Sequence, residues 1–394
     1  MFKKDFPFFQ NSKLVYLDNG ATTQKPKIVI DSQTEYYEKY CSNTHRSNFG
    51  IANKATLEFE KARNGLKDFI NASKSEEIIF TKGVTESLNF IASSFAKDFK
   101  TIIISSLEHH SNIVPWHMQG RTLGNGLEVV NCDKNLNFDL AHFEELLKTK
   151  PNAFVSITHI SNAFGKIHDI KTIIALAHFY GAVVMVDGAQ SLAHLKIDVQ
   201  DLDVDFFAIS GHKTFAPTGV GAIYIKENFL KEIKPYQTGG ATIQEVDFSG
   251  STLLDSPYKF EAGTQNIAGI IGFARAIEYI NYVRYENIQS IENKVFAYLN
   301  EELSKLPDIE FYNDLENCIG SRSFNFKGLV HDDVGILLDK MGVAVRVGHH
   351  CAQPIMKKLG IKGTIRASTA FYNDYIDVDK LIDSLETALK MLRG

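Results

Sequence analysis

The feature that most constrains this chain is a regular alternation of short β-rich runs with amphipathic helical segments, beginning near residue 76. Seven runs are predicted as strands: EEIIF (76–80), TIIISS (101–106), LEVVN (127–131), AFVSITHI (153–160), AVVMVDG (182–188), VDFFAIS (204–210) and GAIYIK (221–226). Segments between them, such as 138–149 and 170–181, carry apolar residues at helical spacing. Because parallel strands need helical crossovers on the faces of the sheet, this alternation predicts an α/β fold with a mostly parallel sheet.

The pattern changes after residue 265, where one long helical pattern covers 267–306. Short strands then alternate with helical segments to the C-terminus, which is typical of a small α+β domain; the strands are predicted at 322–326, 343–348 and 363–369, the helices at 332–342 and 378–392. We therefore expect a large domain over residues 16–265. A smaller C-terminal domain is expected over residues 266–394, together with residues 1–15.

Charge and cysteine content limit the class of partner and the compartment. The 394 residues include 42 basic and 47 acidic ones, a net charge of -5 without long runs of one sign. This balance indicates no nucleic-acid or anionic-membrane partner. The four cysteines, Cys41, Cys132, Cys318 and Cys351, show no CxxC spacing, and no apolar run reaches the roughly 18 residues of a spanning helix. We expect a cytoplasmic protein that acts on small molecules.

Two strand ends carry the residues that point to chemistry. Asp187 follows four apolar residues, and Ser210, His212 and Lys213 end a later strand. Alone, Asp187 could cap a helix and Lys213 could be a surface residue. Together with the Gly-rich continuation they favour pyridoxal phosphate, bound as a Schiff base to the lysine with the acid beside its pyridinium nitrogen.

Other strand ends carry residues that could bind the phosphate and the ring of the same cofactor. Gly83, Val84 and Thr85 follow a strand and open a helix, where backbone N–H groups bind phosphate; a simple capped helix is the alternative. His109 or His110 could stack on the ring. Asn162 and Gln190 are placed at strand ends as donors to the ring oxygen.

These residues resemble the cysteine desulfurases of the class V aminotransferase group, specifically the Suf-type second subgroup. The likeness runs from YLDNGATTQKP at residue 16 to IRASTAFYND at 365–374 and includes, in order, NTHR, EHHSNIVPW, THISNAFG, VDGAQS, SGHKTFAPTGVG, FEAGTQN and RVGHHCAQP. The resemblance implies the fold of the fold-type I transferases that depend on pyridoxal 5'-phosphate, with a large domain and a smaller C-terminal one.

The resemblance also implies a role for each matching residue. Lys213 would hold the cofactor as an imine, Asp187 would pair with the pyridine nitrogen and His109 would stack on the ring. Gln190 and Asn162 would surround the ring oxygen, and Thr85, Ser210 and His212, with Gly83 and Val84, would bind the phosphate. Thr264 looks like the residue lent to the phosphate of the opposite subunit, which implies a homodimer with shared active sites.

Substrate contacts are expected around one arginine. Arg366 matches the arginine that clamps the substrate α-carboxylate, a task suited to its bidentate fork. Arg346, His349 and Asn162 are expected to join it around the substrate.

Cys351 follows two histidines directly. Adjacent His349, His350 and Cys351 point in different directions and no second ligand pair exists at zinc spacing, so we predict no metal site. Alone, the cysteine could be a buried structural residue. Its match to the family's Gly-His-His-Cys-Ala turn favours the sulfur-accepting nucleophile instead. Arg346, His349 and His350 are the nearest groups that could favour the thiolate, and the two histidine roles are not separable from sequence.

The implied reaction converts L-cysteine to L-alanine, leaves a persulfide on the enzyme, and supplies sulfur through a Suf acceptor protein to iron–sulfur cluster assembly. Three alternatives are open. A selenocysteine lyase would share nearly every residue. Another class V aminotransferase or lyase would have no use for Cys351, and a non-enzymatic binding protein on this fold would hold no imine.

Two segments depart from the family pattern. HRSNFGIANKA (45–55) replaces the usual sequence after the HR motif, so contacts near Ser47 with substrate or partner are open. FGKIHDI (164–170) places Lys166 and His168 where we expect them to lie near the cofactor ring.

Overall fold

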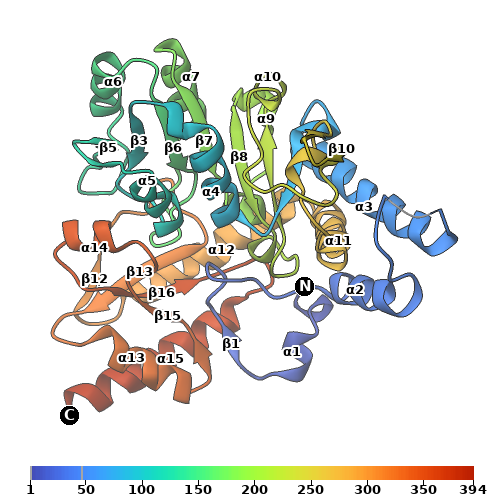
Figure 1. The fold of residues 1–394 in the computed structure, drawn as a ribbon. Helices are drawn as coiled ribbons and strands as arrows, with labels where there is room; N and C mark the ends of the chain where they lie inside the picture. Colours follow the sequence, from blue (N-terminus) through green and yellow to red (C-terminus); the bar gives the residue numbers. More distant parts are fainter. Residues whose placement is uncertain (1, 46–47) are drawn as a thin grey trace.

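The computed structural model describes residues 2–45 and 48–394. Its centre is an eight-stranded sheet of order β2-β9-β8-β7-β6-β3-β5-β4 (Figure 1). The strands are β2 (Ile78–Thr81), β3 (Ile102–Ser105), β4 (Thr122–Leu123), β5 (Gly126–Val130), β6 (Phe154–Thr158), β7 (Val183–Asp187), β8 (Phe206–Ser210) and β9 (Gly221–Ile225). Only β9 runs antiparallel to its neighbours, β2 and β8. The predicted mostly parallel sheet is confirmed, and all seven predicted strands form.

Alternate residues of each strand enter opposite hydrophobic cores, because successive side chains of a strand point to opposite faces. Val155 and Val184 face one core, and Phe154 and Met185 face the other. The first core is closed by α2 (Lys27–Lys39), α3 (Gly50–Phe69), α6 (Leu140–Thr149), α7 (Ile170–Phe179) and α11 (Ile267–Val283). The second is closed by α4 (Val84–Ser94) and α5 (Val114–Met118). Both faces of the sheet are therefore buried, as its apolar strands require.

A second, four-stranded antiparallel sheet lies beside the first, in the order β12-β13-β16-β15. It consists of β12 (Ile309–Phe311), β13 (Ser321–Phe326), β15 (Arg346–Gly348) and β16 (Thr364–Ser368), and its core includes residues of α12 (Tyr285–Ser304), α13 (His331–Lys340) and α15 (Tyr375–Arg393). Near the N-terminus, β1 (Val15–Tyr16) pairs in parallel with β14 (Val343–Ala344).

The helical pattern predicted over 267–306 is confirmed, with one interruption. The chain forms two helices, α11 and α12, separated by Arg284, whose φ of 70° interrupts the helical backbone. Residues of α11 pack in the core of the large sheet, whereas Val295 and Leu299 of α12 pack in that of the small sheet. The apolar spacing continues across the break because both helices bury a stripe. The predicted domain boundary at 265/266 stays a prediction.

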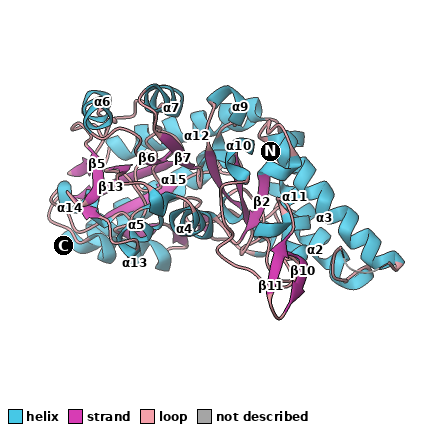
Figure 2. Ribbon diagram, turned by 45° about the horizontal axis from the view of Figure 1, so that its top comes forward, coloured by secondary structure: helices cyan, strands magenta, loops and turns pink. Residues whose placement is uncertain are grey.

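Shorter elements complete the fold: α1 (Phe8–Asn11), α8 (Ser191–His194), α9 (Val199–Leu202), α10 (Glu227–Leu230) and α14 (Gln353–Lys358). The hairpin of β10 (Ile243–Asp247) and β11 (Gly250–Leu253) projects from the rest of the chain (Figure 2). Its Phe248 is fully exposed.

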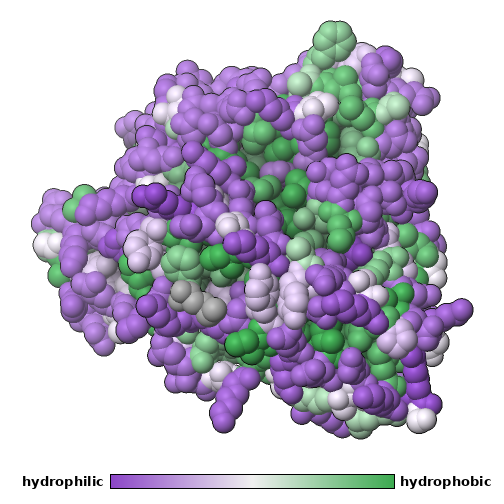
Figure 3. All heavy atoms as spheres, turned by 180° about the vertical axis from the view of Figure 1, so that it is seen from behind, coloured by the Kyte–Doolittle hydropathy of each residue, from purple (hydrophilic) through white to green (hydrophobic). Residues whose placement is uncertain are grey.

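The surface is mostly hydrophilic when the molecule is viewed from behind, and hydrophobic side chains show mainly in recesses between polar ones (Figure 3). Among residues 2–45 and 48–394, no helix is both long enough and apolar enough to cross a membrane.

Candidate functional site

A cavity of about 640 Å³ opens at the carboxyl ends of the parallel strands, where α/β folds collect their functional groups. It brings together most of the predicted site residues: Gly83, Val84, Thr85, His109, Asn162, Asp187, Gln190, Ser210, His212, Lys213, Arg346 and Cys351. They come from the ends of β7 and β8, from β15, and from the segments after β2, β3, β6, β7, β8 and β15. Residues far apart in the sequence therefore meet around one space.

Lys213 and Asp187 form the charged centre of this cavity. Asp187 ends β7, and Lys213 lies in the single turn after the neighbouring β8. Burial lowers the pKa of Lys213 to about 8, against the opposing effect of the Asp187 charge. Burial also raises the pKa of Asp187, while the Ala189 N–H (2.9 Å) and Lys213 oppose the rise. The site therefore holds an amine that loses its proton readily beside a buried acid.

The start of α4 is arranged to receive an anion. Ser87 N–H makes the first intrahelical hydrogen bond, to the Gly83 carbonyl at 3.1 Å, so the preceding N–H groups of the first turn are available to a ligand. Thr85 Oγ1 lies 2.8 Å from Ser111 Oγ. Gly221 of β9 packs against this turn, since a Cβ there would lie 2.7 Å from the Gly83 Cα. The turn is therefore held in place from behind by the sheet.

The loop after β3 presents His109 to the cavity. Its Nδ1 accepts the Ser111 N–H at 3.1 Å and contacts Ser111 Oγ at 3.1 Å. Burial lowers the pKa of His109 to about 3, aided by Lys213, so the ring is neutral at pH 7. A neutral, flat imidazole with fixed orientation can stack on an aromatic ligand. Ser111, which orients it, was not predicted from the sequence.

A buried carboxyl group beneath this loop was also missed. Glu108 accepts hydrogen bonds from Ser105 Oγ (2.5 Å), Thr158 N (3.0 Å) and Asn112 Nδ2 (2.7 Å), and burial raises its pKa to about 7. It ties the loop after β3 to the end of β6. The sequence signal that could have identified Glu108 is its position directly before His109.

The donor set of the cavity fits pyridoxal 5'-phosphate. It contains an amine of lowered pKa, a buried acid, a neutral imidazole and a helix N-terminus with available N–H groups. Gln190 Nε2 donates to the Gly20 carbonyl at 2.8 Å, so this amide is already engaged on one side of the cavity.

Cys351 lies on a turn of unusual backbone. His350 and Cys351 have φ of 51° and 56°, a conformation that costs energy for two consecutive residues other than glycine. Three contacts hold the turn: Asn162 Nδ2 donates to the His350 carbonyl (2.7 Å), His110 N–H donates to the Cys351 carbonyl (2.7 Å), and Gln353 N–H donates to His110 Nε2 (3.2 Å). The surroundings therefore impose the turn. His110 was considered from the sequence only as a stacking residue, and its contacts are to the turn.

Arg346, His349 and His350 make different contacts around Cys351. Arg346 Nη2 lies 3.8 Å from Sγ. His349 Nδ1 accepts the Cys351 N–H at 3.1 Å, whereas His350 is buried and its Nε2 contacts Thr364 Oγ1 at 2.8 Å. Burial lowers the pKa of His350, so this ring is neutral and supports the turn. Of the three groups, Arg346 brings a positive charge to the sulfur.

Arg366 lies behind the cavity wall rather than on it. It is fully buried, with Nη1 donating to the Asn162 carbonyl (2.8 Å) and Nη2 paired with Asp18 Oδ1 (2.6 Å). Its Nε has no partner among the described residues. Gly20 separates it from the cavity, since a Cβ on Gly20 would lie 3.0 Å from the guanidinium carbon. The role predicted for Arg366 toward the substrate carboxylate stays a prediction.

Thr264 is not brought to this cavity within one chain. It lines a separate hollow of about 750 Å³ with Asn43, Thr44, His45 and Tyr258. Its predicted role toward a partner subunit stays a prediction. Ser47, where contacts were left open, lies outside the described residues.

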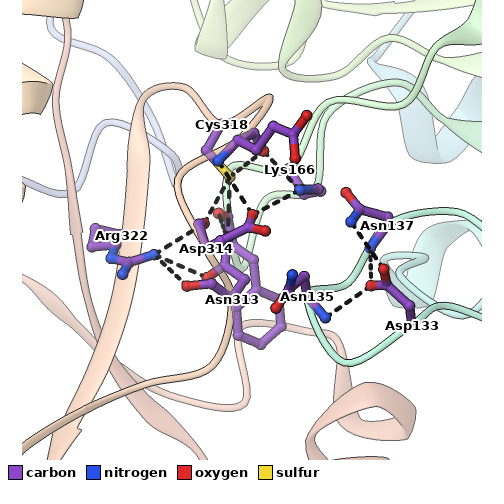
Figure 4. A network of polar contacts seen from close by, with 10 residues as sticks. Asp133, Asn135, Asn137, Lys166, Asn313, Asp314, Cys318 and Arg322 are labelled. Carbon is purple, nitrogen blue, oxygen red and sulfur yellow. Dashed lines mark hydrogen bonds and ion pairs between the residues drawn. The ribbon is translucent and has the colours of Figure 1, made fainter.

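The expectation that Lys166 and His168 lie near the ring is wrong. Lys166 is buried and pairs with Asp314 (3.1 Å) while donating to the Glu316 carbonyl (2.7 Å), in a network that includes Cys318 (Figure 4). His168 contacts the Thr158 carbonyl at 2.8 Å and packs against Phe138. The segment turns back through an Ile160–Ile167 bridge, which carries these side chains away from the cavity. Lys166 instead joins the loop after β6 to the small sheet.

Metal ligation is not supported by any cluster in the described part of the chain, where no group of three or more His, Cys, Asp or Glu side chains could hold an ion.

Comparison with known proteins finds one matching family and many relatives. Residues 15–381 match the model described as aminotransferase class-V. The chain is 40% identical over 387 residues to a cysteine desulfurase of Synechococcus elongatus, covering 96% of this chain but only 62% of that protein. It is 41% identical to a probable cysteine desulfurase of Halalkalibacterium halodurans, covering 98% and 96%. The structure of an apo cysteine desulfurase from Thermococcus onnurineus aligns with a TM-score of 0.93 at 40% identity, covering 98% and 97%.

Proposed function

The chain belongs to the class-V aminotransferase family, and on that premise we propose that it is a pyridoxal 5'-phosphate-dependent cysteine desulfurase of the Suf type. It converts L-cysteine to L-alanine and keeps the sulfur as a persulfide on Cys351. The observation that carries the proposal is the meeting of the Cys351 turn with Lys213 and Asp187 around one cavity. An aminotransferase needs the last two residues and has no task for the thiol.

The cofactor would be held by residues that line the cavity. Lys213 would supply the amine that carries it, the first turn of α4 with Thr85, Ser210 and His212 would receive its phosphate, and His109 would stack on its ring. When bound, pyridoxal phosphate withdraws the electron pair that is left at the substrate Cα. Asp187, a buried acid of the cavity, would face the pyridine nitrogen and favour its protonated form.

Two groups act directly on the substrate. Lys213, with a pKa of about 8, is a base of suitable strength to remove the Cα proton once its amine is free. Cys351 attacks the substrate sulfur as a thiolate, so a sulfur–sulfur bond forms and the Cβ–sulfur bond breaks. The electron pair stays with the carbon fragment, which takes a proton at Cβ and leaves as alanine.

Arg346 and Arg366 provide the positive charge. Arg346, 3.8 Å from Sγ, interacts favourably with negative charge on the attacking sulfur. Arg366, behind Gly20, is the clamp for the substrate carboxylate. One Arg366 nitrogen is already paired with Asp18. The substrate carboxylate must therefore share the guanidinium with Asp18 or displace Asp18 from it. Asn162 lines the cavity and donates to the His350 carbonyl. His349 is not among the residues that line the cavity, and it accepts the Cys351 N–H; both residues are proposed as further substrate contacts.

The length of the Cys351 turn supports the Suf-type assignment and an acceptor protein. Residues 349–352 alone separate β15 from α14, so Cys351 cannot swing far from the cavity. A protein that takes its sulfur must bring its own thiol to the turn. Iron–sulfur cluster assembly is the destination that we propose for this sulfur.

A homodimer is proposed from the position of Thr264. This residue lines a hollow beside the projecting hairpin, together with residues 43–45, and has no task in its own subunit's cavity. A second copy seated there would bring Thr264 to the partner's phosphate, as the family pattern implies.

The deciding experiment measures alanine and sulfide from L-cysteine, with dithiothreitol as reductant, for the pyridoxal phosphate-loaded wild type and Cys351→Ala. We expect stoichiometric alanine and sulfide from the wild type. The variant should keep the visible absorbance of the bound cofactor and lose at least about 100-fold in rate, because the nucleophile is missing. Equal alanine from both proteins would contradict the proposal. Selenocysteine turnover retained by Cys351→Ala, with no cysteine turnover by the wild type, would support a selenocysteine lyase.

A further inference from the structure

A groove lies directly beside the Cys351 turn. It has a volume of about 730 Å³ and is lined by Gln353, Pro354, Met356, Lys357, Ile361 and Lys362, on and just after α14. Figure 1 shows α14 at the outer edge of the molecule. Gln353 belongs to both places, because its N–H binds His110 Nε2 while His110 N–H binds the Cys351 carbonyl. The groove therefore begins two residues after the nucleophile, and His110 contacts both.

The groove carries unneutralised positive charge. Lys357, Lys358 and Lys362 are exposed, and none forms an ion pair within 4.0 Å with a described residue. The Lys358 ammonium contacts the carbonyl and the sulfur of Cys132, at 3.4 and 3.6 Å. The chain as a whole has a net charge of -5. This local excess of lysine thus opposes the charge of the molecule, and it is complementary to a carboxylate-rich surface.

The floor of the groove is rigid and joined to the active site. Ile355 and Met356 are buried against Leu107, Ala163 and Phe164, from the loops that carry His109 and Asn162. Pro354 is exposed and Ile361 is half-buried, so the groove also offers apolar surface between the lysines. A charged rim around an apolar floor is the usual anatomy of a protein-binding site.

We propose that the groove of α14 docks the sulfur acceptor, an acidic protein surface that presents a thiol to Cys351. This inference rests on the proposed function. The acceptor thiolate attacks the outer sulfur of the Cys351 persulfide, and the bond between that sulfur and Cys351 Sγ breaks. The electron pair returns to Cys351 as thiolate, and the acceptor carries the new persulfide, so no further oxidant or reductant is needed.

The test uses thiol acceptors of different charge with the holoenzyme. The probes are a short cysteine peptide rich in Glu and Asp, the same peptide with Lys in their place, and dithiothreitol. Sulfur transfer from the L-cysteine-loaded enzyme is measured against peptide concentration. We expect the acidic peptide to half-saturate at a concentration about tenfold lower than the Lys peptide, a difference that about 0.5 M salt abolishes.

A matched pair of variants locates the effect. The double variant Lys357→Glu/Lys362→Glu should lose the preference for the acidic peptide while keeping its rate with dithiothreitol. Lys380→Glu/Lys390→Glu makes the same charge change on exposed positions of α15 and should keep the preference.

Three results would overturn the inference: no difference between the peptides, equal loss of preference in both double variants, or competition by a single-stranded oligonucleotide as strong as that by the acidic peptide. The last would assign the groove to nucleic acid. Absence of alanine with dithiothreitol would instead contradict the proposed function, so the two failures are distinguishable.

Discussion

At the scale of single residues, the site depends on side chains that neighbouring loops hold in unfavourable states. Cys351 has a left-handed backbone, and Lys213 is deprived of most of its solvent. His110 and Asn162 hold the Cys351 turn by hydrogen bonds, whereas the charge of Asp187 partly offsets the effect of burial on the Lys213 amine. Substitution of these supporting groups should change the reactivity of Cys351 or Lys213 while leaving the fold intact.

His110 is expected to position the Cys351 turn. His110→Ala removes the acceptor for the Gln353 N–H, a hydrogen bond worth about 1 kcal/mol. We expect alkylation of Cys351 to be about five- to tenfold slower and alanine formation to fall by a similar factor. These factors correspond to the free energy of the lost hydrogen bond. Thiol alkylation followed by mass spectrometry measures the effect.

The matched control is His110→Gln, which keeps an acceptor and should recover most of the rate. The absorbance of the bound cofactor should not change in either variant. Loss of that absorbance in His110→Ala would show that the residue serves the cofactor rather than the turn.

The lowered pKa of Lys213 predicts when the cofactor can be loaded. An amine forms an imine only when neutral, and Lys213 becomes neutral above about pH 8, whereas an ordinary lysine does so near 10.4. The loading rate of the apoenzyme should therefore rise steeply between about pH 7 and 9 and then level off. Absorbance of the imine after mixing with pyridoxal phosphate measures it. A rate that keeps rising past pH 10 would contradict the assignment.

At the scale of elements, the close approach of β9 to the turn before α4 aligns the phosphate cradle. Gly221 has no room for a Cβ, which would lie 2.7 Å from the Gly83 Cα. β9 is also the one strand that runs antiparallel to both of its neighbours in the large sheet. Its glycine lets β9, the second strand from the edge of the sheet, approach the turn at the start of α4 closely.

Gly221→Ala should damage both the sheet and the cradle. We expect a loss of about 1 to 3 kcal/mol in the free energy of unfolding, because overpacking forces β9 or the Gly83 turn to move. Cofactor affinity should fall as well. Chemical denaturation and cofactor titration measure the two effects. Gly250→Ala, in the exposed hairpin with nothing within 4 Å of its Cβ, is the control and should change neither.

At the scale of the whole molecule, one subunit does not contain every predicted cofactor contact. Thr264 lies in a hollow separate from the cavity that contains Lys213 and Asp187. If a partner supplies this residue, activity depends on two chains and can be restored between two defective ones.

Mixing Lys213→Ala with Thr264→Ala subunits tests this dependence. In a mixed dimer one site combines an intact Lys213 with an intact Thr264 from the other subunit, whereas the second site has lost both. After co-refolding we expect about half of the dimers to be mixed, each with one site of wild-type cofactor affinity. Recovery no greater than the sum of the two separate variants would place Thr264 in its own subunit's site.

The mostly parallel sheet and most of the residues that line the cavity could be predicted from the sequence. Runs of mostly apolar residues predict β3, β6, β7 and β8, because strands that are buried on both faces carry mainly apolar side chains. Residues directly after these strands meet by the geometry of the sheet alone. Asp187, Lys213 and His109 could therefore be placed from their positions next to strand ends.

Only the tertiary structure decided the contacts between distant segments. The break at Arg284, the pairing of Arg366 with Asp18 and the clamp of His110 on Cys351 join residues that no local pattern relates. Lys166 was misplaced for the same reason, since its partner Asp314 lies 148 positions away. Periodicity reports which face of an element is buried, and it does not report which other element buries it.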